Sequence, residues 1–171
     1  MHIAEGFLPA AQCVAWYAVA TPFVVHGARQ CIKEARKSPE NKILLAAAGA
    51  FTFVLSAIKL PSVSGSSSHP TGTGAGAVLF RPPVMAFLGT VVLLFQALLL
   101  AHGGITTLGA NVFSMAIAGP WIGYGAYRLV RALGGGLLPG VFAAMAVADL
   151  ATYLTTAGQL ALALPDAETG V

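Results

Sequence analysis

The sequence has 171 residues, of which 57% are hydrophobic and only 9% are charged. Because a soluble domain carries roughly 25% charged residues, this composition excludes an ordinary soluble protein and indicates an integral membrane protein. At about 20 residues per membrane span, the length allows one bundle of about six helices. We therefore expect a single membrane domain over residues 1–171, with no room for a second, soluble domain.

The chain begins with MHIAEGFLP, and no basic residue precedes the first apolar stretch. A secretory signal would place a basic head, an apolar run and a small-residue cleavage site in that order. We therefore expect the native amino terminus, with His2 near it, to be kept. Glu5 either pairs with nearby loops or, as exposed carboxylates commonly do, is simply solvated.

Apolar runs separated by Pro, Gly and polar residues predict an all-α, polytopic bundle. The expected helices span residues 10–28, 43–60, 70–80, 83–101, 108–131 and 137–164. The third is too short to cross a membrane alone. Asp149 falls inside the last helix, where an ionisable group is costly, so we expect it to form a hydrogen bond to a neighbouring helix.

Positive charge is concentrated in the stretch RQCIKEARKSPENK, residues 29–42, which the positive-inside rule assigns to the cytoplasm. Alternation of the helices then puts Arg81, Arg128 and Arg131 on the same side, so that eight of the nine Lys and Arg residues are inside. The amino terminus accordingly faces outward. No aromatic residues interleave with these charges, which favours a topology signal over nucleic-acid binding and is compatible with a cytoplasmic partner.

Three of the four histidines fall in outward-facing segments. His2 lies in the amino-terminal segment, His69 in the Gly/Ser-rich loop of residues 59–76, and His102 in the loop of residues 101–111. His26 lies near the inner end of the first helix. Such loops also occur merely to connect helices, so the histidines alone leave a binding role open.

A histidine in the second position has specific chelating chemistry. The free amine of Met1, the deprotonated amide nitrogen of His2 and its Nδ1 close two fused chelate rings on one metal ion, and His69 is the best placed imidazole to complete the set. Planar, nitrogen-rich sites suit Ni(II) and Cu(II), with Co(II) lower in intrinsic affinity. Zinc more often takes a tetrahedral set.

Four long segments carry a resemblance to a known family: MHIAEGFLP, KLPSVSGSSSHPTGTGAGAVLFRPP, VLLFQALLLAHGGITTLGANVFSMAIAGPWIGYGAYRL and DLATYLTTAGQLALALPD. Together they cover well over half the chain. They resemble the CbiM family, the substrate-binding membrane subunits of energy-coupling-factor transporters for cobalt. The resemblance implies a metal site at Met1, His2 and His69.

The same resemblance implies uptake of a divalent transition metal across the bacterial cytoplasmic membrane, in support of cobalamin biosynthesis. It implies ATP hydrolysis on separate cytoplasmic ATPase subunits, a transmembrane coupling subunit and a small two-helix membrane protein as partners, with no cofactor and no nucleic acid. Nickel-type members share the start of the chain but differ around the loop histidine, and GSSSHPTGTG here favours Co(II) over Ni(II). Relatives usually continue with a further helix, whereas this sequence ends at Val171.

His102 and Asn111 are expected to orient the ligand histidines, because metal-bound imidazoles generally donate their other N–H to a nearby acceptor. His102 is alternatively a direct or transient ligand, or a polar interface residue. Asn111 is equally expected to cap or satisfy its loop.

Two rival functions lack their sequence features. An intramembrane metalloenzyme would carry a motif such as H-E-x-x-H, and an ATP-binding loop would follow its glycines with Lys and Ser or Thr; neither occurs. A free-standing metal channel predicts a polar path through the bilayer, but only Asp149 lies between the two faces. We therefore expect a subunit that captures metal outside, releases it inward when partners reorient the bundle, and binds more weakly in acid.

Overall fold

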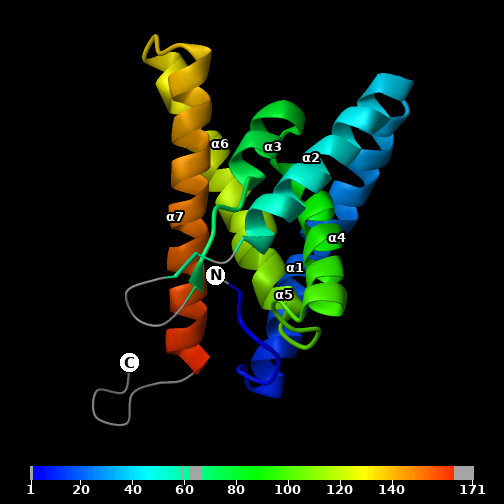
Figure 1. Cartoon of the computed structure of the whole chain (residues 1–171), viewed down its shortest axis with the longest axis vertical. Helices are drawn as coiled ribbons and strands as arrows, with labels where there is room; N and C mark the ends of the chain where they lie inside the picture. The colour runs from blue at the N-terminus through cyan, green and yellow to red at the C-terminus, as the bar shows by residue number, and fades with distance from the viewer. Residues whose placement is uncertain (1, 59, 62–66, 164–171) are drawn as a thin grey trace.

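The computed structural model describes residues 2–58, 60–61 and 67–163, and it is an all-helical bundle (Figure 1). Its helices are α1 (Ala10–Ala35), α2 (Pro39–Ala57), α3 (Thr73–Phe80), α4 (Pro82–Leu100), α5 (Leu108–Asn111), the π-helix η1 (Val112–Ala118), α6 (Gly119–Ala132) and α7 (Leu137–Ala163). A minimal antiparallel pair joins β1 (Leu60–Pro61) to β2 (Ser67–Ser68). Because α5, η1 and α6 follow without a break, they form the single helix that the sequence predicts over residues 108–131.

Four boundaries differ from the sequence prediction by three residues or more, and one of them is the end of α2, which lies at Ala57 and not at residue 60. Helix α1 continues to Ala35, so the first half of the basic stretch belongs to α1 rather than to a loop, because it holds no Pro or Gly before Ser38. Helix α2 begins at Pro39, where the Ser38 hydroxyl accepts a hydrogen bond from the Asn41 amide. Helix α3 begins at Thr73 and not at residue 70, because Gly72 adopts a left-handed conformation with φ of 71°.

The helix junctions fall into two groups at opposite ends of the bundle (Figure 1). The α1–α2, α3–α4 and α6–α7 junctions share one end, uppermost in the figure, and the start of α1, the α4–α5 loop and the end of α7 share the other. The sequence predicts the same grouping from the alternation of helices. Among the described residues, α2, α4 and α7 are long and apolar enough to cross a membrane.

Polar and apolar side chains are distributed as in a membrane protein. Leu98, Leu99 and Phe142 are exposed, whereas Gln96 and Gln159 are buried. Inside the bundle the side-chain nitrogen of Gln96 finds a partner, since its Nε2 donates to the Ser56 hydroxyl at 2.7 Å. Such broad apolar exposure is rare on soluble monomers and indicates contact with lipid or partner helices.

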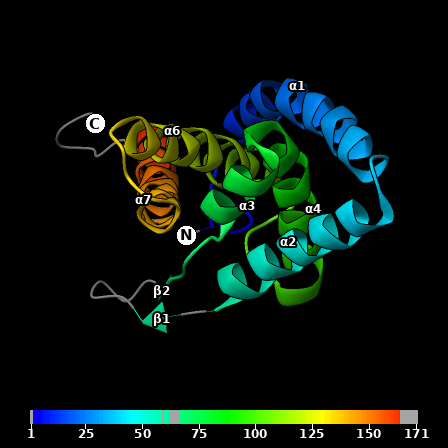
Figure 2. The ribbon, with the colours of Figure 1, turned by 90° about the horizontal axis from the view of Figure 1, so that it is seen from above.

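Glycines let α3 and α6 approach α7 closely. A Cβ added to Gly74 in α3 or to Gly123 in α6 would lie 2.5 Å from the Ala144 carbonyl oxygen of α7. Small residues at helix interfaces permit this separation in membrane bundles. Seen from above, α3 lies beside the α6–α7 pair, and the segment that carries His69 reaches α3 alongside α7 (Figure 2).

Candidate metal centre

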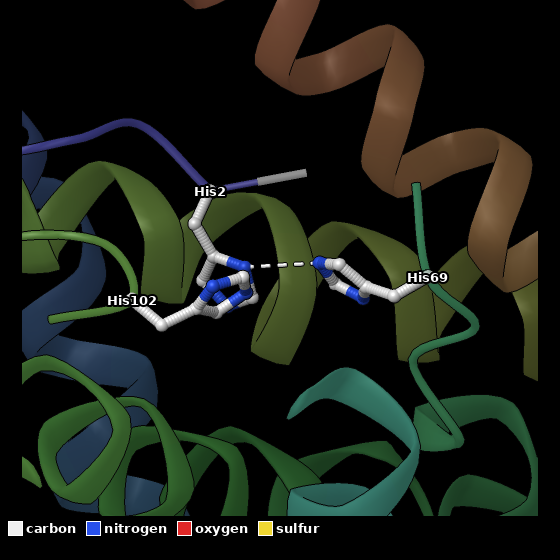
Figure 3. Close-up of side chains that lie close together, drawn as sticks. All are labelled: His2, His69 and His102. Carbon is white, nitrogen blue, oxygen red and sulfur yellow. Dashed lines mark hydrogen bonds between the residues drawn. The ribbon is translucent and has the colours of Figure 1, made fainter. Parts of the chain in front are cut away.

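Three histidines from separate segments meet inside the molecule (Figure 3). His2 comes from the amino-terminal segment, His69 from the stretch between β2 and α3, and His102 from the loop after α4. One ligand nitrogen from each lies within 4.8 Å of the other two. The structure therefore brings together the three outward-segment histidines of the sequence, and Met1 lies outside the described residues.

The closest pair is His2 and His69. Nδ1 of His2 lies 3.0 Å from Nε2 of His69, and the two rings stack with centroids 4.9 Å apart. The His102 ring meets the His2 ring edge-on at 4.2 Å and the His69 ring at 5.3 Å. His69 and His102 are only 3% and 8% exposed, so water competes weakly for their nitrogens.

The backbone after His2 is clamped by Asn111, the last residue of α5, and by Thr107, which lies just before that helix. Asn111 Oδ1 accepts from the Ile3 amide at 2.8 Å, and its Nδ2 donates to the Ile3 carbonyl at 3.0 Å. The Thr107 hydroxyl donates to the same carbonyl at 2.8 Å. Asn111 thus bonds to the backbone of the residue that follows His2.

Glu5, in the same amino-terminal segment, also binds the α4–α5 loop. Glu5 accepts hydrogen bonds from the amide and hydroxyl of Thr106, and these bonds lower the pKa of the Glu5 carboxyl. Glu5 therefore pairs with the loop, as one of the two sequence alternatives expects, while the residue remains exposed to solvent. A Cβ on Gly104 would lie 2.6 Å from the Glu5 Cα, so the second glycine of the HGG sequence leaves room for this segment.

His69 is held by α7. The Tyr153 hydroxyl accepts from the His69 amide at 2.8 Å and donates to the His69 carbonyl at 3.1 Å. One turn earlier, Asp149 Oδ1 accepts from the Thr71 amide at 2.9 Å and from the Thr71 hydroxyl. Asp149 thus bonds to the segment before α3, not to a neighbouring helix as the sequence predicts, because that segment runs alongside α7.

The His69 ring also contacts the backbone of its own segment. Its Nδ1 lies 3.3 Å from the Pro70 carbonyl oxygen. A proton on Nδ1 satisfies that carbonyl and leaves the Nε2 lone pair directed at His2, which is the arrangement that metal-bound imidazoles adopt. Tyr153 was not among the sequence candidates, although its spacing of four from Asp149 places both on one face of a helix.

Burial keeps the imidazoles of His2 and His69 neutral. Burial lowers the pKa of His69 to about 4. It also lowers the pKa of His2 well below its usual 6.5, and the neighbouring His102 and His69 add to the effect. The Nε2 of His2 is buried and has no hydrogen-bond partner among the described residues. Neutral, buried nitrogens with converging lone pairs are suited to a transition-metal cation.

Comparisons with known proteins agree with this geometry. The chain is 68% identical over 171 residues to the cobalt transport protein CbiM of Propionibacterium freudenreichii and 66% identical over 170 residues to that of Streptomyces coelicolor, and it spans 73% of the length of each. A crystal structure of a truncated transition-metal transporter superposes with a TM-score of 0.87 at 32% identity, over 95% of this chain and 75% of the other.

The family described as the cobalt uptake substrate-specific transmembrane region matches residues 2–171. The helical bundle and the histidine cluster are both compatible with this match. The chain belongs to the CbiM family, the membrane components of cobalt uptake.

Proposed function

We propose that this protein captures Co(II) for an ATP-driven importer and presents it at the outer face of the cytoplasmic membrane. The observation that carries the proposal is the 3.0 Å separation between Nδ1 of His2 and Nε2 of His69. Ligand nitrogens about 2 Å from one metal ion lie about 2.8 Å apart at adjacent corners of a square. The pair is therefore close to the spacing that one ion requires.

Two more nitrogens complete the proposed planar set, the amine of Met1 and the deprotonated backbone amide of His2. The amide is directly followed by Ile3, whose backbone is clamped by Asn111 and Thr107. A rigid segment at this point reduces the ordering that chelation requires. The amide and the His2 ring belong to one residue, so fixing Ile3 restricts both nitrogens.

The orientation and the partners follow from the family and the charge distribution. The basic junctions face the cytoplasm under the positive-inside rule, which directs the histidine-bearing segments outward. Metal release then requires a transmembrane coupling subunit and cytoplasmic ATPase subunits to reorient the bundle, with a small two-helix membrane protein as a further partner. The broad apolar surface of α2, α4 and α7 supplies area for lipid and for these helices.

Nickel is the alternative cargo of the same site. A planar set of four nitrogens binds Ni(II) more tightly than Co(II) in the intrinsic order. The names of the similar proteins and the GSSSHPTGTG sequence around His69 favour cobalt.

The test is cobalt loading of the purified protein and cobalt uptake by cells that supply the partner subunits. His69→Ala removes one proposed ligand, and His26→Ala serves as the matched control because His26 lies on α1 beside Gln30, outside the cluster. We expect His69→Ala to abolish stoichiometric loading and uptake and His26→Ala to retain both. Normal uptake by a stably inserted His69→Ala protein would contradict the proposal.

A further inference from the structure

The planar set proposed above uses two imidazoles, but three are present. The His102 ring lies 4.2 Å from the His2 ring, closer than His69 does, and its ligand nitrogen is within 4.8 Å of both partners. A residue that only orients a ligand histidine needs to reach one nitrogen of one ring. His102 instead lies against both rings at once (Figure 3).

We propose that His2, His69 and His102 form a second coordination site of their own, which holds Zn(II) or Co(II) through three imidazoles without the terminal amine or the His2 amide. The inference rests on the proposed function only in that both modes share His2 and His69. The second site adds His102 as a ligand. It also accepts Zn(II), an ion that the planar set does not accommodate. The open fourth position takes water.

The chemistry of this donor set is tetrahedral. Three imidazoles with one water are a recurrent arrangement for Zn(II), at bond lengths of about 2.0–2.1 Å. A regular tetrahedron with such bonds separates its nitrogens by about 3.3 Å. The His2–His69 pair is already at 3.0 Å and the whole set lies within 4.8 Å, so ring movements of about 1 Å bring all three onto one ion.

Each imidazole is held by a different anchor, so the three approach one another as preformed ligands. Asn111 clamps the backbone beside His2, and Tyr153 binds the backbone of His69. The His102 amide donates to the Gln96 carbonyl at 3.1 Å, and the residues on either side of His102 adopt left-handed conformations that turn it inward, with φ of 47° at Ala101 and 86° at Gly103.

The two modes differ in what they require of the chain. The planar mode needs the His2 amide to lose its proton to solvent before the metal–nitrogen bond forms, whereas neutral imidazoles bind at once. The three-imidazole site therefore serves as the first binding site for Co(II). It also makes Zn(II), which favours tetrahedral ligands, a competitor that occupies the shared histidines.

The experiment isolates the second mode by disabling the first. One glycine is added before Met1, and a second preparation keeps the unmodified length but carries a formyl cap on the amine, so that steric disturbance by the extra residue is separated from loss of the amine. Each protein is titrated with Zn(II) and Co(II) alone in detergent, with and without His102→Gln. His26→Gln is the matched control.

We expect both blocked proteins to bind one Zn(II) or Co(II), with the intense visible absorption of tetrahedral Co(II), and His102→Gln to weaken this binding by at least about tenfold. His26→Gln is expected to have no effect. Absence of binding in both blocked proteins, or binding that is indifferent to His102→Gln, would overturn the inference.

The same titrations separate the two proposals. Tight binding by the native protein with none by the blocked proteins leaves the planar capture site standing and removes the three-imidazole site. If native and blocked proteins bind equally and this binding depends on His102, the three-imidazole site stands and the planar capture site is removed, because the amine then contributes nothing. Absence of binding in the native protein and in the blocked proteins would remove both proposals.

Discussion

His69 is a nearly inaccessible imidazole in a site that must stay neutral to bind metal. Its pKa of about 4 means that the folded protein takes up fewer protons than the unfolded chain between pH 4 and the ordinary histidine value of about 6.5. Protonation therefore favours unfolding over this window. The stability associated with neutral His69 is complete above pH 6.5 and is lost as the pH falls toward 4.

The metal-free protein is accordingly expected to lose stability on acidification from pH 7 to pH 5. The separation of the two pKa values corresponds to about 2 kcal/mol from His69 at pH 5. In thermal melts in detergent, the native midpoint should fall by several degrees more than that of His69→Gln, which cannot take up this proton. An equal fall in both proteins would show that His69 is not the group responsible.

Sequence patterns predicted the neighbourhood of the site better than its contacts. His2, His69 and His102 were singled out because they fall in loops that helix alternation places on one side, and the structure brings all three together. Asn111 was identified, but its contact with the Ile3 backbone was not, because a sequence carries no information on which atoms meet between segments 108 positions apart. Tyr153 was missed despite its spacing of four from Asp149, since an aromatic residue in an apolar helix is ordinarily a core residue.

Helix α7 links the His69 segment to the rest of the bundle. Tyr153 and Asp149 contact His69 and Thr71 respectively, and Gly74 of the adjoining α3 packs on the backbone of α7. The position of His69 therefore follows α7 rather than the residues of its own loop.

Tyr153→Phe is expected to weaken cobalt binding by about 10-fold or more, because the Tyr153 hydroxyl makes both bonds to the His69 backbone. The ring, and with it the packing of α7, is kept. Tyr124→Phe provides the matched control, since Tyr124 stacks on Tyr127 within α6 and lies outside the site. The affinity is measured by isothermal titration. Equal affinities for the two variants would remove the role assigned to α7.

The long apolar helices were the most predictable elements. The expected spans 83–101 and 137–164 correspond to α4 (Pro82–Leu100) and α7 (Leu137–Ala163), because Pro and Gly interrupt the apolar run at their starts. The extension of α1 to Ala35 was missed because charged residues were interpreted as loop. The π-helix Val112–Ala118 was also missed, since widening a helix by one residue per turn leaves no mark in an almost uniformly apolar segment.

In the whole molecule, the basic residues and the three clustered histidines lie apart from each other. The basic junctions lie at one end of the bundle, while the amino-terminal segment is bound by Asn111 and Thr106 in the segment after α4, at the other end (Figure 1). The side-chain amide nitrogens of the buried Gln96 and Gln159 donate hydrogen bonds within the bundle, to the Ser56 hydroxyl and the Ala110 carbonyl respectively. This organisation suits a subunit that captures an ion at one end and depends on others to carry it across.

The amino terminus itself is proposed to bind the metal, and one comparison of two proteins tests this role. Cobalt affinity and stoichiometry are measured for the native protein and for a version with one extra residue before Met1, after equal helix content has been confirmed by circular dichroism. We predict one tightly bound Co(II) in the native protein and a loss of affinity of at least about 100-fold, or about 2.7 kcal/mol, in the extended one. Equal affinity in the two proteins would contradict the account.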